Sequence, residues 1–179
     1  MNSRPVLTLI AAVSADGFIS KGQGVPWNLP RDREHFRSAT RSQWLLIGRR
    51  TYQEMLGWFQ PDHHPLILTR DETFIPPVGQ AVADMHAALE TAARGGAHEL
   101  FVCGGGGAYS AAISLADRLI LTHVGTRLHA GVSFPAVDPD LWQVVSQTHA
   151  AADAENPFDL VFTTYEQLPL QKKAGDSLS

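Results

Sequence analysis

Asp32 lies where the sequence otherwise builds an apolar surface. It belongs to GVPWNLPRDREHF, residues 24–36, in which Trp27 and Leu29 precede it closely. An apolar pocket disfavours the charged carboxylate, so the pKa of such a group rises and it can hold or donate a proton near neutral pH. This chemistry suits hydride addition to a C=N bond, which must be matched by a proton on nitrogen. An acid just after Pro30 would equally stabilise a helix start, and the spacing alone leaves both roles open.

A run of four glycines is a second chemical feature. The strand-like residues 100–103 lead directly into glycines 104–107, and a helical pattern follows. Glycine lets a ligand approach the backbone closely, and a helix start offers free N–H groups and a positive dipole end. The spacing is not the dinucleotide fingerprint G-x-G-x-x-G, because Tyr109 takes the last position, and no Walker-type Gly-Lys-Ser/Thr follows. The pattern favours an anion-binding turn over a plain flexible turn.

A similar strand–glycine–helix junction occurs earlier in the chain. Gly48 is followed by Arg49, Arg50 and Thr51. Arginine carries a fixed charge with forked donors suited to phosphate, although an arginine pair alone is usually solvated surface charge. Two glycine junctions in one domain indicate a ligand with several phosphates. A dinucleotide fits, and the extra arginine favours a 2′-phosphorylated one such as NADPH.

Strand-like and helical patterns alternate along most of the chain. Strand-like runs lie at 6–13, 44–47, 65–68, 100–103 and 118–124, and helical runs at 31–40, 51–58, 84–94 and 107–115. The alternation predicts βαβ crossovers and a mostly parallel sheet, in which the very apolar first run is central. Two later runs, 142–148 and 159–165, alternate in polarity and predict antiparallel edge strands. The predicted class is α/β with a mixed sheet.

The composition fits one globular domain. The chain has 179 residues, of which 44% are hydrophobic and 18% charged. We place the domain at residues 1–167 and expect a disordered polar tail at 168–179. The net charge of -4 argues against a nucleic-acid partner, which would need a basic face. The N-terminal apolar run of about eight residues is too short to cross a membrane.

The cysteine and histidines do not predict a metal site. Cys103 is the single cysteine, which excludes an internal disulfide and fits a reducing compartment, so we expect a cytoplasmic protein. His63 and His64 are adjacent and would point to opposite faces of a strand, and no partner with metal-ligand spacing accompanies them. His123 lies in an apolar run and is expected to be structural.

Six segments together carry a resemblance to a known family. In order they are VLTLIAAVSADGFI, VPWNLPRDREHF, LLIGRRTY, VCGGGGAY, LILTHV and DAEN, spread over residues 6–165. In this order and separation the chain resembles dihydrofolate reductase, and Pro-Trp-Asn-Leu-Pro, one residue, then an acid is the most specific segment. The resemblance implies a three-layer fold with about four helices flanking a mixed, mostly parallel sheet with antiparallel C-terminal edge strands. Several segments also resemble the reductase domain of riboflavin-pathway deaminase-reductases.

The resemblance implies roles for particular residues. Asp32 takes the place of the acid that binds the pterin ring and promotes its protonation, Thr122 that of its supporting threonine, and Trp27 lies beside the ring. The substrate pocket would be lined by Ile10, Ala12, Phe36 and Met55. NADPH would be bound by Ala12, Ile19, Gly48, Arg49, Arg50, Thr51, Thr69, Arg70, Cys103, Gly104, Gly105, Gly106, Gly107 and Tyr109. Gly104 and Gly105 match a pair joined by a cis peptide in the family, and residues 16–25 match a mobile loop over the nicotinamide.

The sequence departs from the family pattern at two places. His63 occupies the place of the arginine that grips the glutamate tail of folate, and a neutral imidazole binds a carboxylate less firmly than a guanidinium does. The Gly-Asp pair that precedes Phe-Pro in the family is replaced here by Val132-Ser133. The residues that match the family's cofactor site therefore fit the family pattern better than those that match its site for the substrate tail.

Three functional readings follow, all for a monomer or homodimer with a small-molecule ligand. The leading one is an NADPH-dependent reductase that transfers hydride to a dihydropterin, converting dihydrofolate to tetrahydrofolate. The second is a riboflavin-pathway 5-amino-6-(5-phosphoribosylamino)uracil reductase, for which Arg31, Arg33 and Arg37 would supply a basic patch. The third is a non-catalytic NADP-binding protein.

Overall fold

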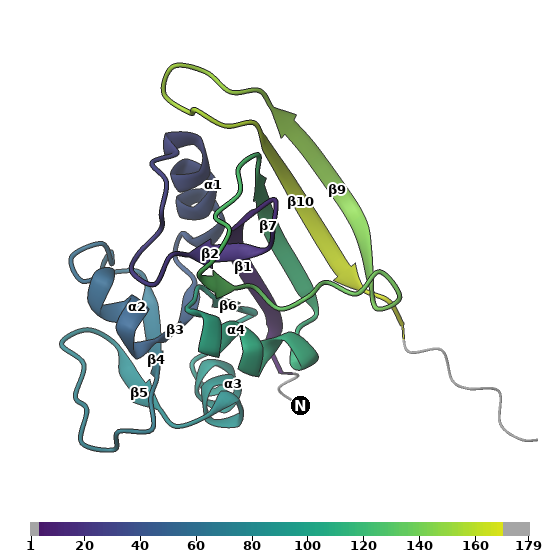
Figure 1. Ribbon diagram of the computed structural model, residues 1–179. Helices are drawn as coiled ribbons and strands as arrows, with labels where there is room; N and C mark the ends of the chain where they lie inside the picture. The colour runs from purple at the N-terminus through teal and green to yellow at the C-terminus, as the bar shows by residue number, and fades with distance from the viewer. Residues whose placement is uncertain (1–3, 170–179) are drawn as a thin grey trace, which may run out of the picture.

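A mixed eight-stranded sheet forms the centre of the molecule (Figure 1). The computed structural model describes residues 4–169. The strand order is β5 (Gln80–Val82), β4 (His64–Leu68), β3 (Trp44–Gly48), β6 (Glu99–Val102), β1 (Val6–Ser14), β7 (Arg118–Val124), β10 (Leu160–Gln167) and β9 (Trp142–Ala150). Neighbours are parallel from β5 to β7, whereas β10 pairs antiparallel with both β7 and β9. The predicted α/β class, the central first strand and the antiparallel edge are confirmed.

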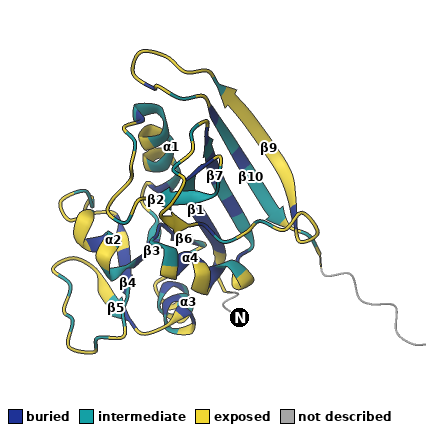
Figure 2. Ribbon diagram, viewed as in Figure 1, coloured by how far each residue is buried: buried dark blue, intermediate teal, exposed yellow. Residues whose placement is uncertain are grey.

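Helices cover both faces of this sheet. Residues of α1 (Pro30–Thr40) and α2 (Arg49–Glu54) pack on one face, and α3 (Met85–Arg94) and α4 (Gly106–Ala112) pack on the other. A 3-10 turn, Ile113–Leu115, follows α4 directly. Figure 2 shows the inner strands mostly buried and β9 exposed along most of its length. Because parallel strands covered on both faces need apolar residues at every position, the strands read as continuous hydrophobic runs.

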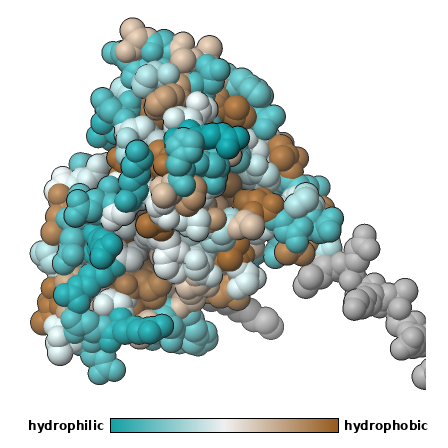
Figure 3. All heavy atoms as spheres, viewed as in Figure 1, coloured by the Kyte–Doolittle hydropathy of each residue, from teal (hydrophilic) through white to brown (hydrophobic). Residues whose placement is uncertain are grey.

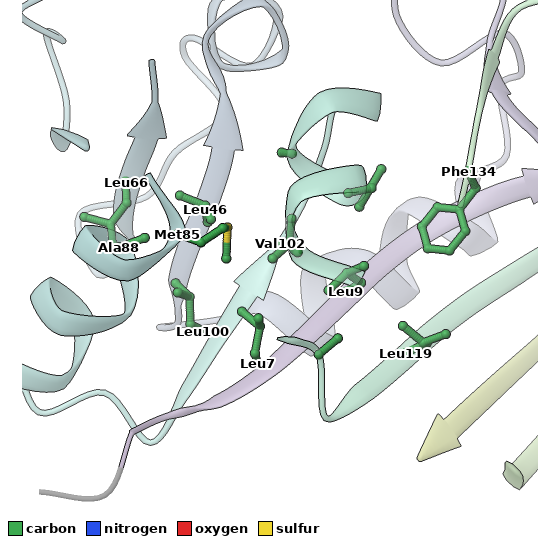
Figure 4. Packing of buried hydrophobic residues seen from close by; sticks show 14 of the residues in the cluster. Leu7, Leu9, Leu46, Leu66, Met85, Ala88, Leu100, Val102, Leu119 and Phe134 are labelled. Atoms are coloured by element: carbon green, nitrogen blue, oxygen red, sulfur yellow. The ribbon is translucent and has the colours of Figure 1, made fainter. Parts of the chain in front are cut away.

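The core on the α3 side is built from alternate residues of neighbouring strands (Figure 4). Leu7 and Leu9 of β1 are fully buried, and Met85 and Ala88 of α3 belong to the same cluster. Ile10, the next residue of β1 after Leu9, faces the α1 side. Because successive strand side chains point to opposite faces, β1 serves both cores and gives the site a rigid floor.

Helix α3 has the expected termini. Its N-cap Asp84 accepts a 2.8 Å hydrogen bond from the Ala87 backbone N–H, and Gly95 is the C-cap. These contacts satisfy groups that a helix end leaves without intrahelical partners. The expected start and stop of this helix are confirmed.

Other boundaries differ from the sequence-based expectation. Helix α2 ends at Glu54 instead of Trp58, because the chain turns at Met55 and reaches a positive φ of 88° at Gly57. The short strands β5, β2 (Phe18–Ser20) and β8 (Val132–Ser133) were not expected. Strands of two or three residues are too short to show an alternating pattern.

The surface is mixed in character. On the face drawn in Figure 3, hydrophobic side chains lie in small groups between hydrophilic ones. Within residues 4–169, no helix is long and apolar enough to cross a membrane. Most of the expected tail, from residue 170 onward, lies outside the described residues.

Candidate active site

One cavity of about 1600 Å³ brings the chemical features of the sequence together. It opens beside the carboxyl ends of β3 and β6, where both glycine junctions lie, and Asp32 of α1 also lines it. Ligands in α/β folds bind at this end of the strands. Every residue assigned above to the substrate or cofactor lines this cavity except His63.

Asp32 lies in the first turn of α1, largely shielded from solvent. Burial raises the pKa of its carboxyl above the ordinary value of 3.8, while a hydrogen bond from the Thr122 side chain and the charge of His35 act in the opposite direction. Thr122 is buried on β7. The group therefore retains its proton at a higher pH than an exposed aspartate does.

The start of α1 is held by a segment far along the chain. The Arg31 backbone N–H donates a 3.0 Å hydrogen bond to Asn156 Oδ1, and the Arg31 guanidinium pairs with Asp153 at 2.5 Å. Asn156 is buried, and its Nδ2 donates to Asp153 Oδ1 at 2.9 Å. Because Leu29 at the N-cap provides no side-chain bond, this distant asparagine does the capping and fixes where Asp32 lies.

The two glycine junctions are in direct contact. The Gly48 N–H donates a 2.6 Å hydrogen bond to the Gly104 carbonyl oxygen, and the Gly104–Gly105 peptide is cis, as the resemblance implied. A Cβ on Gly48 would lie 3.3 Å from the Gly105 nitrogen, and one on Gly105 would lie 2.9 Å from Thr51 Oγ1. The close approach of these backbones therefore requires glycine, and it leaves a surface where a ligand can reach backbone N–H groups.

Tyr109 and Cys103 form the buried wall beside this surface. The Tyr109 hydroxyl donates a 2.6 Å hydrogen bond to the Ile10 carbonyl oxygen, and burial raises the pKa of that hydroxyl well above its ordinary value. Burial likewise raises the pKa of the Cys103 thiol. Both groups therefore stay neutral.

The arginines around the cavity differ in their partners. Arg49 pairs with Asp71 at 2.6 Å and lies 4.4 Å from the centre of the Phe74 ring. Arg50 and Arg70 also line the cavity, and neither forms an ion pair with another of the described residues. The fixed positive charge that a phosphate needs is thus most available at Arg50 and Arg70.

His63 lies apart from the cavity. Its ring stacks on Trp58 at 4.8 Å, and its Nδ1 accepts a 3.0 Å hydrogen bond from the Gln60 N–H. His64 stacks on Trp44, so the adjacent pair does point to opposite sides. His63 is therefore packed against neighbouring side chains. The resemblance, in contrast, placed a residue that contacts the substrate tail at this position.

The segment expected to be a mobile loop is tied down at one end. Strand β2 pairs with β8, and the Asp16 carboxylate accepts backbone N–H bonds from Leu128 at 3.0 Å and His129 at 2.8 Å. These bonds and one from Ser14 hold the pKa of Asp16 well below its ordinary value. Beyond β2, Gly22 and Gly24 have positive φ angles and line the cavity. The mobility of residues 16–25 stays a prediction.

Sequence reasoning missed several residues of the cavity. His35 lies one helical turn after Asp32, so the spacing on α1 was a signal for it. Arg33 and Arg37 also line the cavity; the sequence offered them only for a substrate with a phosphate. Asn156 ends the DAEN segment of the resemblance, yet no local signal reveals its contact with α1, because that contact joins residues 125 apart.

Comparison with known proteins decides the family. A family model for dihydrofolate reductases matches residues 6–167, nearly the whole chain. The chain belongs to the dihydrofolate reductase family. The sequence-based resemblance is therefore confirmed.

Several relatives match over most of both chains. Dihydrofolate reductase of Bacillus subtilis strain 168 is 28% identical over 95% of this chain and 99% of its own length. The type 3 enzyme of Salmonella typhimurium is 30% identical over 89% of this chain and 96% of its own length. The type 6 enzyme of Proteus mirabilis is 32% identical over 81% and 91%, respectively.

A solved structure shows the same fold. Dihydrofolate reductase from Enterococcus faecalis, complexed with NADP(H) and RAB-propyl, gives a TM-score of 0.82 and covers 90% of this chain and 96% of that one. The sequence identity is 23%. The three-layer dihydrofolate reductase fold is thus confirmed.

Proposed function

We propose that this protein is an NADPH-dependent dihydrofolate reductase that converts dihydrofolate to tetrahydrofolate. The observation that carries the proposal is that a shielded carboxyl, Asp32, lines the same cavity as the two glycine junctions. A dinucleotide at the glycines and a heterocycle at the acid would therefore share one space. Family membership supports the same activity and the same cofactor.

The residues on the substrate side supply an acidic handle in an apolar pocket. Bound NADPH would provide the hydride. Asp32 would bind the amidine edge of the pterin ring and assist protonation at ring nitrogen, with Thr122 holding the carboxyl through its hydroxyl. Ile10, Phe36 and Met55 would pack against the flat ring and exclude water. The raised pKa of Asp32 suits this role, because the carboxyl keeps its proton to a higher pH than an exposed aspartate does.

The residues on the cofactor side fit a dinucleotide phosphate chain. A side chain on Gly48 or Gly105 would meet neighbouring atoms, so the backbone surface there is kept open. Helices α2 and α4 have only 6 and 7 residues. We therefore base the phosphate assignment on backbone N–H groups, Thr51 and the unpaired arginines rather than on a helix dipole.

The anionic tail of folate has an alternative partner to His63. Arg33 and Arg37 are four residues apart on α1, so they share one face of the helix, and both line the cavity. Neither forms an ion pair with another described residue, in contrast to Arg31. We place the tail carboxylates here, because a guanidinium binds a carboxylate in a bidentate manner.

The same two arginines also favour a second candidate function. A ribosylaminopyrimidine with a phosphate, the substrate class of the riboflavin pathway, would need positive charge in the same place. Its ring would again be held at Asp32. The two candidates differ in the substrate alone.

The deciding experiment measures NADPH oxidation by the purified protein with each substrate. Dihydrofolate turnover supports the proposal, turnover with the pyrimidine alone supports the second candidate, and NADPH binding without either reaction favours a non-catalytic protein. Asp32→Asn is expected to lower kcat/KM by about 10²- to 10⁴-fold. Asp140→Asn is the matched control, because Asp140 is exposed and outside the cavity. Equal activity of the two variants would reject the role of Asp32.

The cellular setting also remains a proposal. A cytoplasmic location fits the single cysteine, which is buried. A monomer or homodimer is our proposal for the assembly.

A further inference from the structure

His35 is a half-buried titratable side chain in the cavity to which the proposed mechanism gives no role. It lies on α1 one turn after Asp32 and lines the same cavity. Its ring packs on Phe162 of β10 at 4.6 Å with an interplanar angle of 49°. This contact fixes the plane of the imidazole next to the carboxyl.

The Nε2 atom of His35 is buried and has no hydrogen-bond partner. Among the described residues, Trp27 Nε1 is the other buried side-chain atom in this condition, and Trp27 lines the same cavity. A buried polar atom without a partner costs about 1–3 kcal/mol, so native proteins rarely keep one without a reason. Both residues line the cavity, while these two nitrogen atoms are themselves covered by protein.

Asp32 is the charged group that acts on His35. Burial lowers the pKa of the imidazole, and the charge of Asp32 raises it. Reciprocally, the charge of His35 lowers the pKa of Asp32. Each group therefore shifts the pKa of the other in favour of its own charged partner.

The other elements packed around this pair contribute little opposing charge. Thr122 of β7 and Phe162 of β10 are uncharged. Tyr109 of α4 interacts with the charges of Asp32 and Cys103, and burial keeps both the hydroxyl and the thiol neutral. The exposed neighbours of His35 on its own helix are Arg33, Glu34 and Arg37, whose charges are screened by solvent.

We infer that His35 is a positioning residue that sets the protonation of Asp32 and thereby the pH range of turnover. A protonated imidazole holds the neighbouring carboxyl ionised, whereas a neutral one lets it keep its proton. This inference rests on the proposed function for its link to catalysis, although the coupling itself is a property of the protein alone.

The first test measures the coupling without any turnover. The His35 imidazole is titrated by NMR in the wild-type protein and in Asp32→Asn. Removing the carboxylate is expected to lower the pKa of His35, because Asp32 raises it in the native protein. His123 is an internal control: it is half-buried, bonds to the Tyr165 hydroxyl at 2.9 Å and lies outside the cavity, so its titration should not move. An unchanged His35 titration would overturn the inference.

The second test measures the pH profile of kcat/KM with dihydrofolate. His35→Phe keeps a ring against Phe162 and removes the charge, so the midpoint assigned to Asp32 should move upward by roughly half a unit or more. His123→Phe is the matched control and should leave the midpoint in place. A purely structural role would lower kcat at every pH without moving the midpoint, and that result rejects the inference. Absence of wild-type turnover would instead reject the proposed function, and the NMR titration would still decide the coupling.

Discussion

The Arg49 guanidinium donates a 2.6 Å hydrogen bond to the Asp71 carboxylate while it lies over the Phe74 ring. The pKa of Asp71 is held below its ordinary value by hydrogen bonds from Thr73 and from Arg49, so the carboxylate is charged at neutral pH. Arg49 lines the cavity at the glycine junction that we assign to NADPH. One of the arginines expected to bind phosphate is therefore already neutralised by a neighbour.

Releasing Arg49 should strengthen the preference for NADPH over NADH. In Asp71→Asn the guanidinium is free to pair with the 2′-phosphate, and a local negative charge is removed. The ratio of Kd values for NADH and NADPH should rise by roughly two- to fivefold, because a partly exposed ion pair is weak. Asp62→Asn is the control, since Asp62 is an exposed acid outside the cavity. Equal changes for both cofactors would show that Arg49 does not contact the 2′-phosphate.

Arg33 and Arg37 should determine the affinity for the substrate tail. In the double variant Arg33→Ala/Arg37→Ala, KM for dihydrofolate should rise about tenfold or more, since each lost charge-assisted bond is worth about 1.5–3 kcal/mol when shielded and less when exposed. KM for a dihydropterin without the glutamate tail should stay near the wild-type value. Arg41→Ala is the control, because Arg41 lies after the end of α1 and does not line the cavity. A parallel rise for both substrates would contradict the tail assignment.

Replacing Asp32 should stabilise the fold while it removes activity. A raised pKa in the folded state means that the favourable contribution of the protonated acid is present below its ordinary pKa of 3.8 and is lost as pH rises through the folded pKa. At neutral pH, Asp32→Asn should therefore have a higher Tm than the wild type, by about 2–4 °C for each kcal/mol relieved. The difference in Tm between Asp32→Asn and the wild type should become smaller as the pH is lowered. Thermal unfolding scans measure it, and a lower Tm at neutral pH would contradict this account.

Removing the distant cap of α1 should affect both stability and catalysis. Asn156→Ala leaves the Arg31 N–H without its acceptor, so the free energy of unfolding should fall by about 1–3 kcal/mol. The start of α1 carries Asp32, so kcat should also fall. Denaturant titration and steady-state kinetics provide the two measurements. Asn28→Ala, at an exposed position before α1, serves as the control and should change neither value much.

A side chain on Gly105 should disturb the contact between the glycine junctions. In Gly105→Ala the new Cβ would lie 2.9 Å from Thr51 Oγ1, so we expect weaker NADPH binding, by roughly tenfold. The single variant Thr51→Ala should also weaken binding, because it loses a hydroxyl that we assign to the phosphates. Adding Gly105→Ala to Thr51→Ala should cost little more, because the oxygen that the new Cβ would meet is gone. Fluorescence titration of the cofactor measures all three variants. An equal loss from Gly105→Ala with and without Thr51 Oγ1 would place the cause elsewhere than in this clash.

The sequence predicts those parts of the site that depend on local chemistry. The apolar run at β1, the glycines before α4 and the acid beside Trp27 all carry strong local signals, and the fold and family they indicated are confirmed. The individual residue roles stay predictions. The contact of Asn156 with α1 and the pairing of Arg49 with Asp71 were not predictable, because each depends on how distant segments meet in space.

The missed cavity residue His35 has a different explanation. Its position one turn after Asp32 was visible, yet an isolated histidine on a helix has many structural roles. The orphaned Nε2 and the contact with Phe162 become evident only when β10 is in place. The short pair β2 and β8 was hidden for another reason, since such brief strands leave no periodic signal.

The capping of α1 by Asn156 ties the acid to a segment that is synthesised long after it. A nascent chain that has emerged only through β7 already contains both glycine junctions and Asp32. It still lacks the asparagine that fixes Arg31 and the strand that packs on His35. Competence to reduce a substrate should therefore arise only after β9 and β10 have left the ribosome and docked.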